Sequence, residues 1–309
     1  MATMTVGLVP HPTKSVDGSL DKIRTWRDAC GVSLLALEHD AARIGPDITL
    51  VDEDAFTSSV DAVIALGGDG TMLGAMRLVS GRPVPVLGVN YGNVGFLVEV
   101  DPEELPAALD RINAEEYQLE SHHALEVSLV QAGTENRYLA FNDVAVARRP
   151  GSGVVSADLS VDDTPYGYYR VDALVIATSA GSTAYNYAAG GPILSPAVAA
   201  AVVTPVASMS GIDRSVVLSH REKLRLSIAE GTHSAALEVD GRVLADVGAG
   251  CELTLQLRRN AGMVLRFDAS RHANRGRIKL SLMDLPLRRD QLLELVPPEV
   301  RARVQPPRY

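Results

Sequence analysis

The chain has 309 residues, of which 46% are hydrophobic and 22% are charged, a composition typical of globular proteins rather than of disordered or membrane-embedded chains. This length fits one large domain or, as the better prediction, two domains of medium size. The formal net charge of −9 argues against a nonspecific nucleic-acid binder, because such proteins use basic surfaces to displace counterions from phosphate, so no nucleic-acid partner is predicted.

The first hundred residues alternate short apolar runs with longer amphipathic segments. Alternation of strand and helix predicts a parallel sheet with helices packed on its faces. Ligands of such sheets bind beyond the carboxyl ends of the strands, so the turns that follow the strands are the first candidates for a site. The predicted strands cover residues 6–9, 32–37, 60–66 and 84–89, and the predicted helices cover residues 15–30 and 72–79.

Beyond residue 100 the pattern changes to short β-type segments separated by turn signals. A helix from Asp101 to about Ile112 precedes them. We predict an α/β domain over residues 1–100 and a mainly antiparallel β domain over residues 101–274, with the leucine-containing tail, residues 275–309, packed back on the first domain. The predicted β segments are 124–130, 137–148, 154–161, 224–229, 234–239, 252–258 and 262–268.

Cysteine usage and the apolar stretches of the chain indicate its compartment. Cys30 and Cys251 are far apart and in no C-x-x-C spacing, which predicts buried, reduced thiols rather than a disulfide or a thiolate metal site. Residues 1–10 lack the regions of a signal peptide, and the longest small-apolar stretch, residues 197–203, is too short to span a membrane. We predict a cytoplasmic protein without a membrane partner.

The sequence Gly67-Gly68-Asp69-Gly70-Thr71 lies between a predicted strand and a predicted helix. Its glycines allow a sharp turn and a close approach to a ligand, and the N–H groups that open the helix would face an anion. A carboxylate there repels phosphate, so Asp69 needs another task, either accepting a proton from a hydroxyl or holding a metal ion that bridges phosphates. The alternative is an ordinary tight turn in which Asp69 caps its own backbone and Thr71 is the helix N-cap.

Two further loops carry candidate motifs. Asn90-Tyr91-Gly92-Asn93-Val94-Gly95-Phe96-Leu97 follows the next predicted strand, so this loop and the first motif would face one cleft; the alternative is a purely structural turn. Residues 177–185 offer small side chains, hydroxyls and the flat phenol of Tyr185 to a ligand. The alternative there is a solvent loop that leads into a helix capped by Ser182 or Thr183.

Polar residues also interrupt otherwise apolar segments. Asp172 is flanked by apolar residues, so it needs a partner or a ligand if it is buried. Asn142-Asp143 interrupts a predicted strand, which indicates a bulge, a turn or part of a site. Asp240-Gly241 lies between two predicted strands and is a hairpin signature.

The order and spacing of these motifs, over roughly residues 60 to 245, resemble the NAD kinase family. Diacylglycerol and sphingosine kinases share the G-G-D-G-T turn, but they usually follow it with a glutamate that is absent from residues 72–77. The matching elements are Gly67-Gly68-Asp69-Gly70-Thr71, Asn90-x-Gly92-x-x-Gly95-Phe96-Leu97, Asn142-Asp143, Asp172, Gly181-Ser182-Thr183-Ala184-Tyr185, Gly190-Gly191-Pro192 and Asp240-Gly241.

The resemblance implies a Rossmann-like first domain and transfer of the γ-phosphoryl of ATP, or of polyphosphate, to the 2′-hydroxyl of the adenosine ribose of NAD. Asp69 would be the catalytic base, and Mg²⁺ or another divalent cation would be held through the donor's phosphates. A homodimer or homotetramer is implied as well, because some NAD contacts of the family cross a subunit interface. The implied phosphate- or ATP-binding residues are Gly67, Gly68, Gly70, Thr71, Asn90, Gly92 and Gly95, and the implied NAD-binding residues are Phe96, Asn142, Asp143, Asp172, Thr183, Ala184, Tyr185, Ala188 and Asp240.

This sequence departs from the family pattern mainly on the acceptor side. Asp143 stands where glutamate is usual, and the other departures are Ala173, Ser179, Ala180 and Ala188. They leave open a kinase of this family that phosphorylates another nucleoside-like or polyol hydroxyl. A noncatalytic NAD-binding regulatory protein is a further alternative, against which the intact Asp69 argues, and a lipid kinase is the most distant one.

Overall fold

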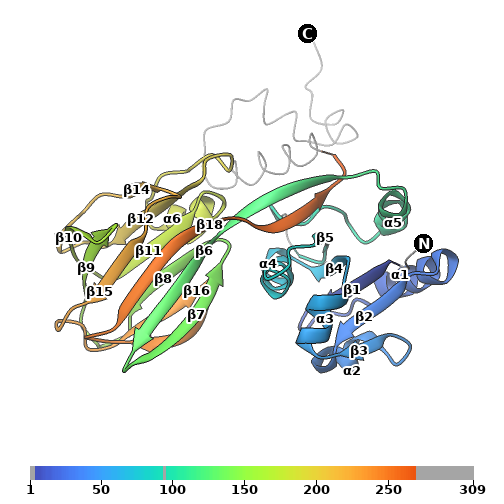
Figure 1. The fold of residues 1–309 in the computed structure, drawn as a ribbon, viewed down its shortest axis with the longest axis horizontal. Coiled ribbons are helices and arrows are strands. Elements are labelled where there is room, and N and C mark those ends of the chain that lie inside the picture. Colours follow the sequence, from blue (N-terminus) through green and yellow to red (C-terminus); the bar gives the residue numbers. More distant parts are fainter. Residues whose placement is uncertain (1–3, 93–94, 269–309) are drawn as a thin grey trace, which may run out of the picture. The chain divides into compact units, whose positions relative to one another are not determined.

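The computed structural model in Figure 1 describes residues 4–92 and 95–268. The predicted packing of residues 275–309 therefore lies outside the described residues. The described chain divides into two compact units, the first made of residues 4–75, 84–120 and 264–268 and the second of residues 76–83 and 121–263. The chain passes from one unit to the other within helix α4 and within the long strands β6 and β18.

A parallel five-stranded sheet forms the centre of the first unit, in the order β5-β4-β1-β2-β3. The strand order reverses between β1 and β4, which is the position where ligands of such sheets bind. Six helical segments accompany these strands in the described chain. The elements are β1 (Thr5–Pro10), α1 (Asp17–Cys30), β2 (Ser33–Leu37), η1 (Glu38–Asp40), α2 (Ala41–Ile44), β3 (Thr49–Val51), α3 (Glu53–Ser59), β4 (Ala62–Gly67), α4 (Asp69–Leu78), β5 (Pro85–Asn90) and α5 (Leu105–Asn113).

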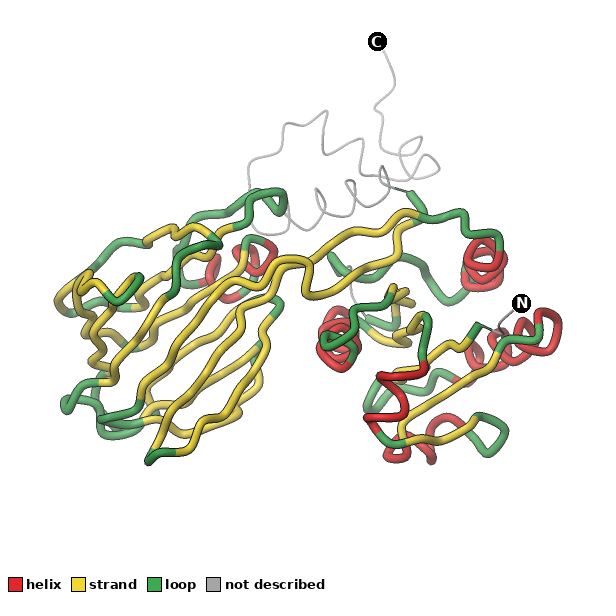
Figure 2. Tube along the Cα trace, viewed as in Figure 1, coloured by secondary structure: helices red, strands yellow, loops and turns green. Residues whose placement is uncertain are grey.

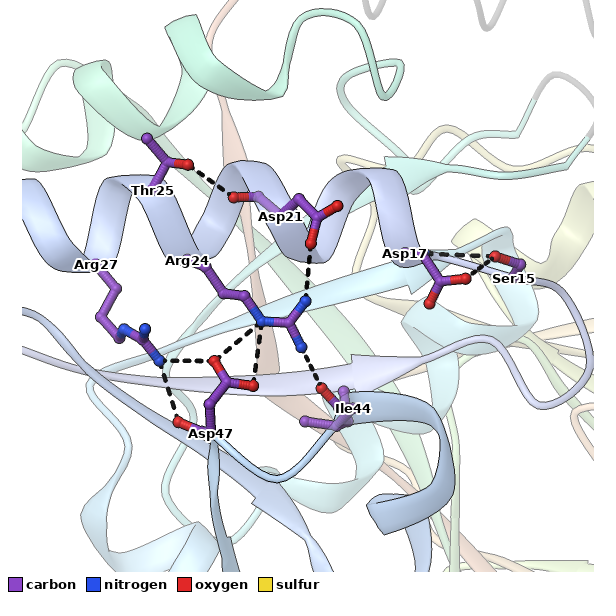
Figure 3. Close-up of polar contacts among 8 residues, drawn as sticks. All are labelled: Ser15, Asp17, Asp21, Arg24, Thr25, Arg27, Ile44 and Asp47. Atoms are coloured by element: carbon purple, nitrogen blue, oxygen red, sulfur yellow. Dashed lines mark hydrogen bonds and ion pairs between the residues drawn. The ribbon is translucent and has the colours of Figure 1, made fainter.

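Helix α1 illustrates why these segments fold as predicted. Leu20, Ile23 and Trp26 recur at helical spacing and are all buried, and the helix ends at Cys30, followed by Gly31 with a left-handed φ of 69°. Figure 3 shows the polar side of the same helix, where Arg24 donates from Nη2 to the carbonyl oxygen of Ile44 at 2.7 Å and forms an ion pair with Asp47 at 3.0 Å. These contacts tie α1 to the segment before β3.

The second unit consists almost entirely of strands, as Figure 2 shows in yellow. In the first sheet the strands of this unit follow the order β13-β10-β9-β15-β18-β6-β7, with β18 also a neighbour of β5, and the second sheet has the order β14-β12-β11-β8-β16-β17. Leu125, Leu226 and Leu253 of the first sheet share one buried cluster with Val146 and Ile176 of the second, so the unit is a β-sandwich. Its strands are β6 (Gln118–Gln131), β7 (Thr134–Ala140), β8 (Asp143–Arg148), β9 (Val155–Val161), β10 (Thr164–Val171), β11 (Ala173–Thr178), β12 (Ala200–Val206), β13 (Ser210–Gly211), β14 (Val216–Ser219), β15 (Leu224–Ile228), β16 (Ala235–Val239), β17 (Arg242–Val247) and β18 (Glu252–Arg266).

The predicted fold class, a parallel α/β domain followed by a mainly antiparallel β domain, is confirmed. Two strand predictions differ from the structure. The segment predicted over residues 137–148 is broken into β7 and β8, because the N–H groups of Phe141 to Asp143 bond to a side chain instead of to a neighbouring strand. The two segments predicted within 252–268 form one strand, β18, in which Asn260 has a φ of 54° and donates its N–H to His123 at 3.3 Å.

Cysteine burial was predicted correctly for one residue only. Cys251 is buried, whereas Cys30 is exposed at the last position of α1, beyond the buried stripe of that helix. Among the described helices, none combines the length and the apolar character needed to cross a membrane.

Candidate active site

The first glycine motif joins β4 directly to α4. Strand β4 ends at Gly67 and the helix begins at Asp69, so Thr71 lies inside the first turn of the helix. The alternative in which Thr71 is the N-cap is therefore wrong. Met72 and Thr71 donate their N–H groups to the carbonyl oxygen of Gly68, at 3.1 and 3.0 Å. The motif is therefore a helix N-terminus at the carboxyl end of a parallel strand, where backbone N–H groups favour anions.

The carboxylate of Asp69 joins the two glycine motifs of the first unit. Its Oδ2 accepts the N–H of Phe96 at 2.9 Å, and its Oδ1 accepts the N–H of Leu97 at 3.0 Å. Gly95 permits this approach, because a Cβ atom at that position would lie 2.2 Å from Oδ1 of Asp69. The structure thus brings together Asp69, Gly95 and Phe96, which the sequence placed in separate loops.

The remaining residues of these two loops divide by what surrounds them. A Cβ atom on Gly67 would lie 2.0 Å from Oγ1 of Thr71, whereas Gly68 and Gly70 have open space where a Cβ would be. Asn90 supports its own loop, since its side chain accepts the N–H of Gly92 at 3.0 Å and donates to Asp101 at 3.1 Å. The structure therefore gives Asn90 a task within the protein, independent of any phosphate.

The second unit contains another carboxylate that accepts N–H groups from a loop distant in sequence. We call this arrangement, and that of Asp69 with Phe96 and Leu97, a bracket. The side chain of Asp240 is 1% exposed and accepts the N–H groups of Phe141, Asn142 and Asp143 at 3.1, 2.7 and 3.2 Å. Arg77 forms an ion pair with the same carboxylate. Asp240 and Gly241 have φ of 47° and 73° between β16 and β17, as expected from the hairpin signature.

Asp143 lies next to this bracket and is itself only 5% exposed. Burial raises the pKa of Asp143 to about 6, the carboxylates of Asp240 and Glu238 raise it as well, and a hydrogen bond to the backbone of Tyr185 opposes these effects. Burial and the same neighbourhood raise the pKa of Tyr185, whose exposed fraction is 36%. Asp143 and Tyr185 are therefore close together, as the sequence motifs suggested.

The loop that carries Tyr185 packs closely on Asn142. Thr178 donates its hydroxyl to the carbonyl oxygen of Phe141 at 2.7 Å and its N–H to that of Asn142 at 2.9 Å. A Cβ atom on Gly181 would lie 1.9 Å from the carbonyl oxygen of Asn142, so only glycine fits there. The loop continues as η2 (Ala180–Thr183) and α6 (Tyr185–Ala188), in which Thr183 and Ala184 are half-buried and Ala188 is exposed.

Asn186 is a supporting residue that the sequence analysis missed. It is fully buried, donates to the carbonyl oxygens of Ser182 and Pro192 at 2.9 and 3.0 Å, and accepts the hydroxyl of Thr204 at 2.7 Å. Ser182 is fully buried too, so the segment is not a solvent loop. The signal in the sequence was the amide side chain of Asn186, which lies between Gly181-Ser182-Thr183 and Gly190-Gly191-Pro192 and can donate to the backbone of both segments.

Within the second unit, Asp172 lies apart from Asp143, the other predicted acidic residue of the β8–β11 ladder. It forms an ion pair with Arg148 at 2.7 Å, which supplies the partner that an acidic residue in an apolar segment needs. Asp172 accepts the N–H of Arg148 at one end of the β8–β11 ladder, and Asp143 lies at the other end. Five residues of strand separate them, a distance of about 17 Å.

The parallel sheet with a glycine turn at its switch point, together with a carboxylate at the start of the following helix, is typical of a phosphotransferase that handles nucleotides. Two family models match the sequence, the ATP-NAD kinase N-terminal domain over residues 15–117 and the ATP-NAD kinase C-terminal domain over residues 141–262. The NAD kinase of Wolinella succinogenes is 31% identical over 261 residues, which cover 84% of this chain and 89% of the relative. The NAD kinase of Caldanaerobacter subterraneus subsp. tengcongensis is 35% identical over 239 residues, 77% of this chain and 84% of the relative. The chain belongs to the NAD kinase family.

Solved structures show the same fold. The yeast NADH kinase complexed with NADH superposes with a TM-score of 0.80 at 22% identity and covers 94% of this chain and 90% of its own. An NAD kinase from Archaeoglobus fulgidus in complex with ATP gives a TM-score of 0.68 at 22% identity, with 90% of this chain and 99% of its own covered. The two-domain architecture predicted from the sequence is therefore that of the family.

Proposed function

We propose that the protein phosphorylates NAD, transferring the γ-phosphoryl of ATP, or a phosphoryl of polyphosphate, to the 2′-hydroxyl of the adenosine ribose to give NADP. The observation that carries this proposal is the carboxylate of Asp69, fixed at the start of α4 by the N–H groups of Phe96 and Leu97. Family membership supports it. A fixed carboxylate beside a helix N-terminus combines a proton acceptor with an anion site in one turn.

In the proposed reaction Asp69 accepts the proton of the ribose 2′-hydroxyl while the oxygen of that hydroxyl attacks the γ-phosphorus. The bond between that phosphorus and the bridging oxygen breaks, and ADP leaves when ATP is the donor. The N–H groups at Gly68 and Gly70 would bind the phosphates, since phosphoryl transfer depends on positioning and charge neutralisation.

A divalent cation, Mg²⁺ in the first instance, belongs to this proposal. Among residues 4–92 and 95–268, no three His, Cys, Asp or Glu side chains are grouped as metal ligands. Mg²⁺ usually keeps several waters and is bound through substrate phosphates and one or two carboxylates, so a donor phosphate chain at the α4 N-terminus fits its chemistry. The ion would neutralise charge that develops on the transferred group.

For the acceptor we propose binding by the loops around Asn142 and Tyr185, including Ala188, with Phe96 as a further contact. Asp240 would contribute through the backbone of residues 141–143 that it holds. Because Asp172 lies at the far end of the β8–β11 ladder from Asp143, its contact with NAD would come from a second copy of the chain. Such a contact would require a homodimer or homotetramer.

The same reasoning keeps the functional division predicted from the sequence. Residues 1–100 would carry the donor site and residues 101–274 the acceptor contacts other than Phe96, in a cytoplasmic protein. Size-exclusion chromatography with light scattering tests the oligomer: a monomer at micromolar concentration would remove the shared role of Asp172.

The function is tested by incubating the purified protein with Mg²⁺, a donor and a panel of acceptors. NAD, NADH, adenosine and inositol are each offered with ATP and with polyphosphate, and products are identified by mass spectrometry. We expect NADP from NAD. A phosphorylated product from another acceptor, with none from NAD, would instead support the kinase for a different hydroxyl, which the substitutions at Asp143 and Ala173 to Ala188 left open. NAD binding without any product would support the regulatory alternative.

A further inference from the structure

We propose that Arg266 is a positioning residue for Asp69 and acts through the peptide group between Phe96 and Leu97. The proposal rests on the proposed function, since it gives Asp69 the role of base. Arg266 is the last residue of β18 and lies in the first unit, as do Asp69 and both loop residues. Its exposed fraction is 4%, which is unusual for an arginine and requires an account of its partners.

The guanidinium of Arg266 binds the backbone of the loop that holds Asp69. Nη2 donates to the carbonyl oxygen of Phe96 at 3.0 Å, and Nη1 donates to that of Leu97 at 3.0 Å. The carbonyl of Phe96 and the N–H of Leu97 belong to one planar peptide group. That group therefore receives Arg266 at its oxygen and gives its N–H to Oδ1 of Asp69 at 3.0 Å.

This arrangement fixes which way the peptide group faces. If it rotated by half a turn, its carbonyl oxygen would face the carboxylate of Asp69 and its N–H would face the guanidinium, both of which repel. A positive charge on the oxygen side also polarises the peptide and strengthens its N–H as a donor. Arg266 thus holds the amide, and the amide holds the carboxylate.

Two glutamates in turn fix the guanidinium. Nε of Arg266 donates to Oε2 of Glu120 at 2.7 Å, and Nη1 to Oε2 of Glu99 at 3.2 Å. Glu99 is 3% exposed and also accepts the N–H of Phe267 at 2.8 Å. The planar fork of arginine serves two carbonyls and two carboxylates at once, which a lysine ammonium cannot do from one position.

The test compares Arg266→Lys with Arg24→Lys. Arg24 is a matched control, because it also combines an ion pair with a donation to a backbone carbonyl but makes these contacts on α1, to Asp47 and Ile44 (Figure 3). In the phosphorylation of NAD we expect Arg266→Lys to lower kcat about tenfold to a hundredfold, with KM for NAD and ATP within about threefold. Arg24→Lys should keep the wild-type kcat. Equal effects of the two substitutions on kcat would contradict a positioning role.

A double-mutant cycle separates action through Asp69 from a general loss of structure. In the Asp69→Asn background, Arg266→Lys should lower the residual kcat by less than about twofold, because the group it positions is already changed. If Arg266→Lys lowered kcat as strongly in the Asp69→Asn background as in the wild type, the proposal would be overturned. If Arg266→Lys does not fold, the pair Arg266→Gln with Glu99→Gln removes both charges together, avoids an unpaired buried carboxylate and must show the same kcat loss.

Amide hydrogen exchange gives a readout that does not depend on the substrate. Protection of the Phe96 and Leu97 amides should fall at least about tenfold in Arg266→Lys and stay at the wild-type value in Arg24→Lys. Unchanged protection would overturn the proposal whatever the activity. Wild-type protein that forms no NADP, with the exchange result as expected, would contradict the proposed function alone. Active wild type with normal kcat in Arg266→Lys would contradict this inference alone.

Discussion

Asp69 in the first unit and Asp240 in the second use the same device for different ends. Each carboxylate accepts N–H groups from a loop distant in sequence, Phe96 and Leu97 in one case and residues 141–143 in the other. In the second unit Arg77 forms an ion pair with the carboxylate itself, and that side chain is 1% exposed. In the first unit Arg266 donates to the carbonyls of the loop, and Asp69 is half-buried at a helix start.

The difference lies in where the arginine acts, on the carboxylate itself at Asp240 and on the loop backbone at Asp69. A cation on the carboxylate completes a structural tie and uses the oxygens. A cation on the far side of the loop, as at Phe96 and Leu97, fixes the amides that bind the carboxylate. Sequence motifs alone, an aspartate before a glycine in both Asp69-Gly70 and Asp240-Gly241, do not distinguish the two.

Asp69→Asn tests the reactive bracket and should have the largest effect. We expect kcat for NADP formation to fall at least about a hundredfold, a typical loss when a general base is removed. The unfolding free energy should change by less than about 1 kcal/mol, because the asparagine carbonyl still accepts one of the two amides and the site is only half-buried, unlike that of Asp240. Kinetics and urea unfolding measure both quantities, and near-normal turnover would remove Asp69 from the base role.

Asp240→Asn makes the same substitution in the structural bracket. It should lower the unfolding free energy by about 2 kcal/mol, since the new amide nitrogen faces Arg77 or a backbone N–H and leaves a buried donor without an acceptor. Asparagine tolerates the positive φ of 47° at this position, so the turn itself is preserved. A urea midpoint equal to that of the wild type would contradict the distinction between the two brackets.

Gly95→Ala tests whether the close approach to Asp69 matters for turnover. The added Cβ would lie 2.2 Å from Oδ1 of Asp69, so the carboxylate must move, and we expect kcat to fall about tenfold. Gly74→Ala is the matched control in α4, where open space surrounds the site. It should keep kcat and raise helix stability by about 0.5 kcal/mol. Equal kcat in the two variants would mean that the approach is not required.

Asp143→Asn should have the smallest effect and one that depends on pH. The pKa of Asp143 is raised from 3.8 to about 6 by burial and by Asp240. A raised pKa in the folded state contributes stability that is fully present below about pH 4 and is lost as the pH rises through about 6. We therefore expect the asparagine variant to be more stable than wild type by about 1 kcal/mol at pH 7.5 and nearly equal at pH 4. Thermal unfolding at both pH values measures this, and a difference independent of pH would contradict it.

Local patterns explain why the first domain was predictable. Strand β4 is a short apolar run that is buried at every position and ends at the glycine motif, so its length and composition identify it as a buried strand. Strand β10 was missed, since it contains Pro165 and Gly167, and both residue types argue against a strand when only the sequence is known. Strand β12 was missed because its alanines and Pro205 favour no single structure.

The supporting contacts of the site were beyond prediction for a different reason. Asp240 and Asn142 are 98 residues apart, and Arg266 and Phe96 are 170 apart, so no local period connects them. The motifs indicated that Asn142-Asp143 and Tyr185 belong together through family resemblance. The burial that brings Asp143 to a pKa of about 6 follows only from the packed sandwich.

The glycines of the first motif fall into two groups once their surroundings are known. Gly67 has no room for a side chain, whereas alanine at Gly68 or Gly70 would meet no atom of the protein within 4 Å. Folding therefore demands glycine at only one of these three positions. At the other two positions, the proposed binding of donor phosphates is the reason to keep glycine, so a selection for stability alone should let residues 68 and 70 drift while position 67 stays glycine.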